Sequence, residues 1–557
     1  MPRDSIPGAH TEQVSAAKPR QADVLIRLAE AGELYHAPDG TSFADLAVNG
    51  HRETWAIRSR GFRRWLAARY YEATGGAPNS EAIQSALAII EAKGAFDGRE
   101  RTVHVRVAGV DDLLYLDLAD TEWRAVEIDA AGWRITGAPP VRFRRAPGML
   151  PLPVPVLGGS LAELRPLVNV RDELGIVLIV AWLLAALRNR GPYPVLALTG
   201  EQGSAKSVLA AILRALVDPN TVALRAPPRD DRDLYIAATN GHIVPLDNVS
   251  SLPPWLSDAL CRLSTGGGFA TRQLYSDTDE VLLDATRPIV LTGIEDVVTR
   301  GDLADRAITV RPDPIPEDRR RPEREIWAQF EAARPRILGV LLDAVVHGLQ
   351  HLATTQLARL PRMADFAVWA TACEGALWPP GTFAAAYGAN RAEMDETVIE
   401  ADAVATAVRS LMVDRTIWTG TAGTLLPLLV GIVGDAAKAK TWPASPRALA
   451  GRLRRAAPNL RRVGISIIFG ARESKGRPIT IYQIDEPSDR HDRHHRHQPS
   501  DSAAPRNDGR MTDDAATVIA TVTPDHSRSA RNDGRDGDDG RIHPHSAGDQ
   551  EPAEWTL

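Results

Sequence analysis

Hydrophobic residues between positions 160 and 315 form short continuous runs that alternate with longer stretches of helical spacing. Strands that are buried on both faces give continuous runs, and the helices between them lead from one parallel strand to the next. The run at 195–198 is followed by a glycine-containing turn and then by an apolar-periodic segment at 206–216. The pattern predicts an α/β core with a parallel sheet over residues 160–315.

The residues before this core have a different pattern. Residues 1–20 are polar and lack periodicity, which predicts a disordered N-terminus. Helical spacing followed by short alternating segments then predicts a small α+β domain over residues 21–150. Its helices are expected at 22–31, 61–73 and 81–92, its hairpin turn at 38–40, and its later strands at 101–107, 113–118, 125–129 and 133–137.

Two features of this domain allow both a functional and a structural interpretation. The segment 51–70, rich in arginine and with two tryptophans, fits a contact with a phosphate backbone or the solvated face of a helix. A group of aspartates fits the metal site of a polymerase or the ends of hairpins, where aspartate is common. These aspartates are Asp111, Asp112, Asp117 and Asp120. The pattern favours the structural interpretation of both features.

Beyond the core, residues 320–400 are predicted to form a helical region. Residues 401–484 contain three helical segments and then two strands around a polar turn at Lys475 and Gly476, which is typical of a winged-helix DNA-binding domain. A Ser-Pro pair at 445–446 predicts the start of the third helix. Its arginines are expected to contact DNA, with protein contacts as the alternative role of the domain; they are Arg447, Arg452, Arg454 and Arg455.

Composition limits the functional classes. The net charge is -6, with 71 acidic and 65 basic residues, so any contact with nucleic acid has to be local. The two cysteines, Cys261 and Cys373, have no metal-ligand spacing and are expected to be core residues in a reducing compartment. The N-terminus has no apolar signal segment, and the longest apolar run, 175–187, is too short to span a bilayer. We therefore expect a cytoplasmic protein without a membrane partner.

The polar tail at 487–557 repeats the sequence RNDGR and is predicted to be disordered. Its histidine-rich stretch, 491–497, fits a solvated charge run better than a metal site, because no folded scaffold is expected around it.

Residues 200–207, GEQGSAKS, stand between the predicted strand and helix, where a phosphate-binding loop is expected. Backbone N–H groups of such a loop point at a triphosphate, and the following helix adds its partial positive charge. The lysine binds the β- and γ-phosphates as a compact charge, and the serine hydroxyl binds Mg²⁺. We predict an ATP and Mg²⁺ site held by Gly200, Gly203, Ser204, Ala205, Lys206 and Ser207, with Ala205 in the place of the usual second glycine.

A phosphate-binding loop needs a carboxylate at the end of a neighbouring strand to hold the metal through water. Asp247 follows the apolar run 243–246 and is predicted to fill this role. The next residue is Asn248, where many ATPases have a glutamate; an asparagine orients water but cannot accept its proton. With asparagine in this position, we expect either slow ATP hydrolysis or a general base that another part of the protein supplies.

Four further residues are candidates for contacts away from the loop. Arg272 and Tyr275 follow three glycines and are expected on a projecting hairpin, where charge and an aromatic ring suit single-stranded nucleic acid. A surface hairpin without a ligand is the alternative. Arg306, or Arg300 before it, is placed to reach the nucleotide of a neighbouring subunit, and an ion pair with Asp302 or Asp305 is the equal alternative for both.

In this order, the segments GEQGSAKS, PLDN, LSTGGGFATRQLY, RPIVLTG and LADRAI resemble the A, B, B-prime and C motifs and the arginine finger of superfamily 3 helicases. These are AAA+ motors of phage, plasmid and viral replication, and the likeness is greatest to the motor part of primase-helicases from actinobacterial mobile elements. The resemblance implies a P-loop AAA+ core and a homo-hexameric ring that hydrolyses ATP between subunits and grips one DNA strand. Carried over, Lys206 and Ser207 bind phosphate and Mg²⁺, and Asp247 holds the water of the metal.

The resemblance further implies that Arg272 contacts the strand and that Arg306 reaches the neighbour's nucleotide. Thr292 stands where the family has an asparagine that senses the γ-phosphate, and Asn248 replaces the second acidic residue. Both exchanges weaken the expectation of fast hydrolysis and leave the expectation of binding intact.

The sequence therefore supports an ATP-dependent DNA helicase or translocase that binds single-stranded and duplex DNA and acts in the replication of a mobile element, with a separate primase as a potential partner. The alternative is an assembly protein that binds DNA under the control of ATP, with weak or absent hydrolysis. A small-molecule kinase is disfavoured, because it would need neither the predicted hairpin nor the winged helix.

Overall fold

The structure, a computed structural model, describes residues 19–272, 280–283, 285–294, 296–472 and 476–484. Of 269–272 and 280–283 only the backbone is described. The predicted disordered tail, the histidine-rich stretch, Tyr275 and Lys475 lie outside these residues, as does the predicted disordered N-terminus except its last two positions. Among the described helices, none is long and apolar enough to cross a membrane.

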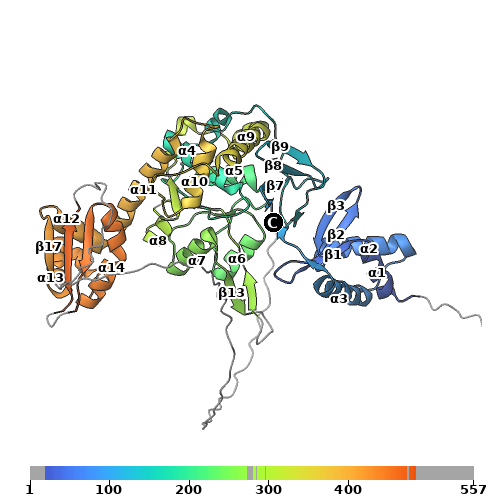
Figure 1. The fold of residues 1–557 in the computed structure, drawn as a ribbon, viewed down its shortest axis with the longest axis horizontal. Coiled ribbons are helices and arrows are strands. Elements are labelled where there is room, and N and C mark those ends of the chain that lie inside the picture. Colours follow the sequence, from blue (N-terminus) through green and yellow to red (C-terminus); the bar gives the residue numbers. More distant parts are fainter. Residues whose placement is uncertain (1–18, 273–279, 284, 295, 473–475, 485–557) are drawn as a thin grey trace, which may run out of the picture. The chain divides into compact units, whose positions relative to one another are not determined.

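The N-terminal residues form a four-stranded sheet covered by helices (Figure 1). The sheet order is β3-β2-β1-β4, and Leu25, Phe62 and Ile90 pack together in its core. The Ser59 hydroxyl starts α2 by accepting the amide of Phe62. The elements are α1 Gln21–Ala29, β1 Glu33–His36, β2 Ser42–Val48, β3 His51–Ala56, α2 Arg60–Thr74, α3 Ser80–Phe96 and β4 Arg99–Glu100. The predicted helices and hairpin turn of this region are confirmed.

A second antiparallel sheet follows, in the order β6-β7-β8-β9. Two short strands, β5 and β10, pair beside it. The bounds are β5 Val103–His104, β6 Val107–Val110, β7 Leu113–Asp117, β8 Ala125–Asp129, β9 Gly132–Thr136 and β10 Arg142–Phe143. Asp117 is buried and pairs with Arg145 at 2.8 Å, and Asp120 pairs with Arg124 at 2.7 Å, which supports the structural interpretation of these two aspartates.

A four-stranded parallel sheet forms the centre of the chain, in the order β12-β15-β11-β16. Its strands are β11 Val195–Thr199, β12 Val244–Leu246, β15 Ile289–Gly293 and β16 Ala307–Val310. The helices of this region are α4 Glu173–Ala186, α5 Lys206–Val217, α6 Asp231–Thr239, α7 Pro254–Thr265 and α8 Gly301–Ala304. The predicted α/β class with a parallel sheet is confirmed. The apolar run at 175–187 is α4, which is buried on all sides and therefore shows no polar face.

The helices that follow the sheet in the sequence pack against this region. They are α9 Glu323–His351, α10 Ala364–Glu374 and α11 Thr382–Ala401, preceded by the 3₁₀ turn η3 Glu317–Arg319. α9, α10 and α11 all contact α4, which places α4 at the centre of the largest core cluster. Cys261 and Cys373 are free and buried, as predicted, and burial raises the pKa of the Cys261 thiol to about 11.

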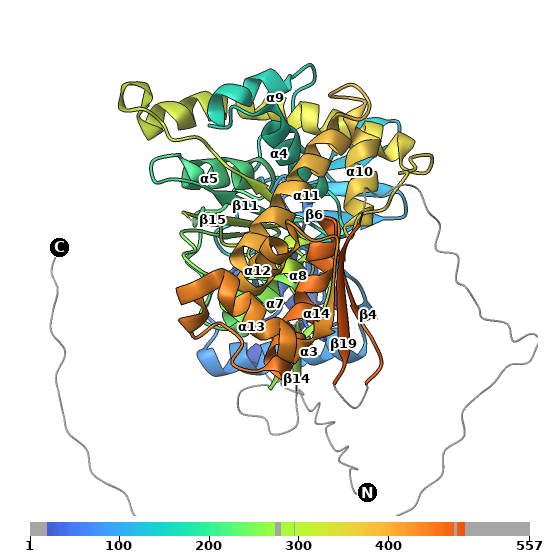
Figure 2. The same cartoon turned by 90° about the vertical axis from the view of Figure 1, so that its left-hand side faces the viewer.

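Residues 403–483 form three helices and a three-stranded antiparallel sheet (Figure 2). The elements are α12 Ala403–Met412, β17 Ile417–Thr421, α13 Ala422–Val433, α14 Pro446–Arg462, β18 Ile465–Phe469 and β19 Pro478–Gln483. Leu449, Leu453 and Leu460 of α14 pack into the core of this module. The three helices and the last two strands are where the sequence predicts them. Strand β17 is not, because its exposed edge position leaves it without a clear apolar alternation.

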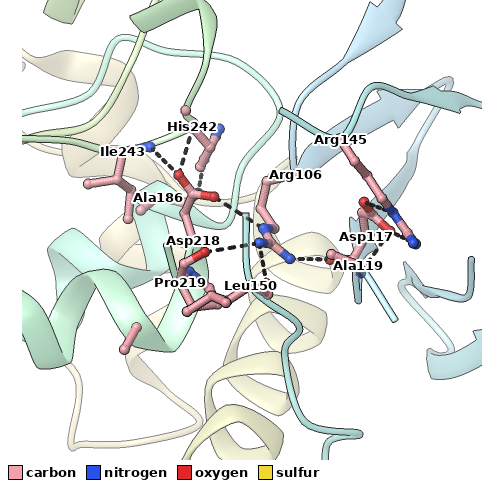
Figure 3. A network of polar contacts seen from close by, with 12 residues as sticks. Arg106, Asp117, Ala119, Arg145, Leu150, Ala186, Asp218, Pro219, His242 and Ile243 are labelled. Carbon is pink, nitrogen blue, oxygen red and sulfur yellow. Dashed lines mark hydrogen bonds and ion pairs between the residues drawn. The ribbon is translucent and has the colours of Figure 1, made fainter. Parts of the chain in front are cut away.

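A buried polar network joins the second sheet to the central region (Figure 3). Arg106, fully buried, pairs with Asp218 at 3.2 Å and donates to the carbonyl of Asp117 at 2.9 Å. The other oxygen of Asp218 accepts the amides of His242 and Ile243 at 2.8 and 3.1 Å. Asp218 follows α5 and His242 precedes β12, so one carboxylate connects the C-terminal end of α5 to the start of β12. Buried ionic groups of this kind are tolerated only when they are fully paired.

Stability is expected to fall as the pH is lowered from 6.5 to 4. Burial lowers the pKa of both His104 and His242 to about 4. In this window the unfolded chain takes up a proton at each histidine and the folded chain does not, so each adds a slope of up to about 1.4 kcal/mol per pH unit. Urea unfolding midpoints at several pH values measure the effect. His104→Gln should flatten the profile, whereas a change at the exposed His351 should not; equal slopes in all three proteins would refute the assignment.

Candidate nucleotide and DNA sites

The turn between β11 and α5 is a compact loop with unusual backbone angles. Gly203 has φ 82° and Ala205 has φ 61°, both in the left-handed region. An alanine there is strained, because its Cβ crowds the backbone at positive φ. The amide of Asn169 donates to the carbonyl of Ser204 at 3.2 Å, and the amide of Ile315 to the carbonyl of Gly203 at 3.3 Å. The segments before α4 and after β16 thus hold the loop in this shape.

Lys206 is the first residue of α5, and its ammonium lies inside the loop. It donates to the carbonyls of Gly200 and Glu201 at 2.8 and 2.6 Å and to the hydroxyl of Ser204 at 3.1 Å. Partial burial lowers the pKa of Lys206, and the Asp247 carboxylate acts in the opposite direction. The ammonium is therefore held by three oxygen atoms of the loop itself.

Ser204 is fully buried, and its hydroxyl donates to the carbonyl of Glu201 at 2.8 Å. Its side chain supports the loop, so only its backbone amide is left for the predicted contact with nucleotide. Gly200 lies against the chain that follows β16, where a Cβ would stand 3.1 Å from the carbonyl oxygen of Pro312. A side chain at this position would push the two segments apart.

Three predicted residues meet around the carboxylate of Asp247, which follows β12. Its Oδ1 accepts the hydroxyl of Ser207 at 2.8 Å and the hydroxyl of Thr292 at 2.5 Å. Thr292 in turn accepts the amide of Asn248 at 2.9 Å. Asn248 has φ 56°, a conformation that asparagine tolerates better than most residues. The carboxyl ends of β12 and β15 and the start of α5 therefore converge on one group of hard oxygen atoms.

An open pocket of about 570 Å³ lies over these groups. Its lining includes Lys206, Ser207, Asp247, Asn248 and Thr292, together with Gln202 and Ile294, which the sequence does not single out. The carboxylate and hydroxyl oxygens suit Mg²⁺, which is usually bound by one or two carboxylates, water and the phosphates of a substrate. Within the described part of the chain, no cluster of three His, Cys, Asp or Glu residues could hold a metal by itself.

A second pocket, of about 440 Å³, adjoins the same loop. Ala205, Val208 and Leu209, at the start of α5, line this pocket, and Leu167, Val168 and Ile326 add an apolar wall. Three consecutive arginines, Arg319, Arg320 and Arg321, form its rim. A guanidinium nitrogen of Arg320 would stand 3.6 Å from a Cβ at Gly203. These arginines are not among the residues predicted from the sequence, although the run RRR is a signal of local positive charge.

Arg306 is outside both pockets of its own chain. It follows α8, its guanidinium donates to the carbonyl of Asp302 at 2.7 Å, and its Nε is buried with no hydrogen-bond partner among the described residues. Arg300 pairs with Asp258 at 2.8 Å and with Asp302 at 3.4 Å. The ion-pair alternative thus describes Arg300 within the chain, while Arg306 has no carboxylate partner in the described residues.

The four predicted arginines of α14 divide into two groups. Arg447, Arg454 and Arg455 are exposed, and Arg452 is half-buried against the Asp402 carboxylate at 3.0 Å. Arg454 lies over the ring of Phe469, 4.8 Å from its centroid. Arg447, Arg452 and Arg455 line one open pocket of about 530 Å³ at the start of the helix. The structure therefore gathers three of the four predicted arginines on one surface.

The predicted projecting hairpin is present in the backbone. β13 Phe269–Arg272 pairs with β14 Glu280–Leu283, with Arg272 opposite Glu280. Arg272 is the last residue of its strand before the connection, and Tyr275 lies outside the described residues. The roles of both residues in binding a strand stay predictions.

Two family models match the chain. Residues 161–398 match the model of the actinomycete integrative conjugative element replication protein, and residues 404–499 match the model of the AICE RepA C-terminal domain. Over these residues the chain is similar to replication proteins of conjugative elements. The prediction of a replication protein from a mobile element is confirmed at this level. No curated protein matches the sequence.

Similar solved structures include two apo structures of the NrS-1 C-terminal region. Each is 12% identical to this chain and covers 84% of it, with 100% of the first and 98% of the second chain aligned. The TM-scores are 0.38 and 0.37. Scores this low carry neither a fold assignment nor an activity.

Proposed function

We propose that this chain is an ATP-dependent DNA helicase or translocase of superfamily 3 type that acts in the replication of a conjugative element. The observation that carries the proposal is the convergence of Lys206, Ser207, Asp247 and Thr292 on one pocket at the carboxyl edge of the parallel sheet. Ligands of open α/β sheets bind at this edge. The match to a replication protein of a conjugative element supports the same function.

The two pockets around the loop fit the two halves of a nucleoside triphosphate. The triphosphate would lie over Lys206, which would exchange its loop oxygens for phosphate oxygens. Ser207 and Asp247 would hold Mg²⁺, which neutralises charge on the phosphates when bound. The apolar wall of Val168 and Ile326 would receive the base. Ala205, which borders both pockets, would lie between them.

Thr292 and Asn248 would support hydrolysis in place of the usual residues. The hydroxyl of Thr292 links the Asp247 carboxylate to the backbone of Asn248, so a change at one group reaches the others. Asn248 lines the pocket and can orient an attacking water without taking its proton. Catalysis then depends on charge stabilisation by Lys206, Mg²⁺ and a cation from a neighbouring subunit.

We assign this cationic role to Arg306, which would act across the subunit interface of a homo-hexameric ring. Its side chain carries charge without a carboxylate partner in the described residues. In such a ring, the hairpin whose first strand ends at Arg272 would reach the DNA strand. A separate primase would supply the priming activity.

The C-terminal module is proposed to be a winged helix, with α14 as its recognition helix. Three exposed or half-exposed arginines around one pocket offer a dense positive surface in a chain of net negative charge. Such a helix enters the major groove or follows the phosphate backbone.

Removing Arg447 and Arg455 together should weaken duplex binding and flatten its salt dependence. Each phosphate that the protein no longer neutralises reduces the slope of log K against log salt by about 0.9. Binding isotherms from about 50 to 200 mM salt measure both quantities. Arg359→Ala, at an exposed arginine of a distant loop, serves as the control. An unchanged slope in the double variant would exclude this surface as the duplex contact.

Strand separation distinguishes the proposal from its alternative. A forked DNA substrate is incubated with the protein, ATP and Mg²⁺, and the released strand is quantified. ATP-dependent release that needs Lys206 supports a helicase. Stable DNA complexes that depend on ATP, with no release and no movement along the strand, would instead identify an assembly protein.

A further inference from the structure

The C-terminal end of α14 contacts the segment that carries Arg306. A Cβ at Gly301 would stand 2.7 Å from the Nδ2 atom of Asn459, so the two helices touch at this point. One turn further along α14, Arg462 reaches the end of α8. The helix with the proposed DNA contacts is therefore in direct contact with the segment 300–306.

Arg462 binds Asp305 through a two-pronged ion pair. Its two terminal nitrogens lie 2.5 and 3.0 Å from the two carboxylate oxygens of Asp305, and one of them lies 2.8 Å from Asp395. These hydrogen bonds, first of all those to Asp305, raise the pKa of Arg462 above its usual range. Planar fork-to-carboxylate pairing fixes direction as well as distance.

The pair belongs to a cluster of four charges. Arg391 of α11 lies 3.1 Å from Asp305 and 3.5 Å from Asp395. Only 14% of the Asp305 side chain and 12% of the Asp395 side chain are exposed. Two carboxylates shielded in this way need both arginines, because a single guanidinium would leave one negative charge unbalanced. Loss of Arg462 is thus expected to move Asp305 rather than leave it in place.

Asp305 is joined to Arg306 in two ways. It is the preceding residue in the chain, and it caps α8, whose Asp302 carbonyl accepts the guanidinium of Arg306 at 2.7 Å. The backbone carbonyl of Arg306 accepts the amide of Val195 in β11 at 2.9 Å, so the main chain is anchored in the sheet. The direction of the Arg306 side chain therefore depends on the position of α8, and α8 is held from outside by α14.

We propose that Arg462 is a positioning residue, which holds α8 so that Arg306 points at the nucleotide of the neighbouring subunit and thereby makes hydrolysis depend on the placement of the DNA-contacting helix. This inference rests on the proposed function, in which Arg306 acts across the subunit interface. Arg462 itself touches neither nucleotide nor the reacting atoms.

Steady-state ATP hydrolysis by the full chain tests the inference. Arg462→Ala should lower kcat by about tenfold and leave KM within about twofold, because binding of nucleotide to the chain's own loop is untouched. Arg462→Lys keeps the charge without the fork and should recover part of the loss. Arg461→Ala is the matched control, because Arg461 is exposed on the same turn and its side chain makes no hydrogen bond or ion pair with the described residues.

Mixed assemblies separate positioning from damage to the fold. Lys206→Ala subunits have an intact Arg306 and no nucleotide site, whereas Arg462→Ala subunits have an intact nucleotide site and a displaced Arg306. Mixing the two should raise hydrolysis above the sum of the separate proteins, because each makes up for the other's defect at a shared interface. A mixture of Arg306→Ala with Lys206→Ala should behave in the same way.

Three outcomes distinguish the proposed role of Arg306 from that of Arg462. If Arg306→Ala retains full kcat, the proposed role of Arg306 fails. If Arg306→Ala is slow and complemented while Arg462→Ala matches Arg461→Ala, the proposed function stands and the positioning role of Arg462 is refuted. If Arg462→Ala is slow but not complemented by Lys206→Ala, its effect is structural, and the inference is likewise overturned.

Discussion

Replacing Lys206 by alanine should abolish measurable ATP binding. The ammonium is the cation enclosed by the loop, and it is held by three oxygen atoms at the start of α5. Its loss removes the charge that balances the β- and γ-phosphates, whereas the backbone amides alone bind a triphosphate weakly. An affinity at least about a hundredfold lower is expected, which corresponds to two charge-assisted hydrogen bonds of about 1.5 kcal/mol each.

Fluorescence titration or calorimetry with ATP and Mg²⁺ measures this affinity. Lys206→Arg keeps the charge and should also bind poorly, because the planar guanidinium does not fit the space of the ammonium. Lys438→Ala, at an exposed lysine paired with the exposed Asp435, is the control for loss of a lysine. Wild-type affinity in Lys206→Ala would remove the phosphate-binding role of the loop.

Replacing Asp218 by alanine should destabilise the chain by about 3–5 kcal/mol, as expected when one partner of a buried ion pair is removed. Arg106 and Asp218 are 0% and 1% exposed, so the guanidinium left behind cannot reach water. The amides of His242 and Ile243 lose their acceptor at the same time. Since Asp218 joins the end of α5 to the start of β12, weaker ATP binding should accompany the loss of stability.

Urea unfolding midpoints compare the variants. Asp435→Ala, at an exposed pair, is the control and should change little. The double variant Arg106→Met with Asp218→Asn should lose less than the sum of its single changes, because no charge remains unpaired and the asparagine oxygen still accepts the two amides. A cost of less than about 1 kcal/mol for Asp218→Ala would show that the network of Figure 3 does not hold these elements together.

Local sequence signals predicted the elements around the proposed nucleotide site. Lys206, Ser207 and Asp247 follow apolar runs that become β11 and β12, and in a parallel sheet such residues meet at one edge. The distance between the motifs in sequence did not matter, because each motif marks the end of its own strand. The hydrogen bond from Thr292 to Asp247 follows from the pairing of β12 with β15.

Long-range contacts were not predictable in the same way. The Arg106–Asp218 pair joins residues 112 positions apart, and nothing in either local pattern indicates a buried charge. Arg462 was not predictable either. The arginines at its end of α14 are typical of an ordinary basic helix end, yet it binds a carboxylate 157 positions away. Strand β17 was missed because an exposed edge strand needs no apolar alternation.

The ATP hydrolysis rate of the purified chain, with and without single-stranded DNA, tests the central claim most directly. A DNA-stimulated rate that disappears in Lys206→Ala is the predicted result, and it would show that Asn248 and Thr292 support catalysis. Tight ATP binding with no turnover under either condition would contradict the claim of a motor and identify a protein that uses ATP only to assemble on DNA.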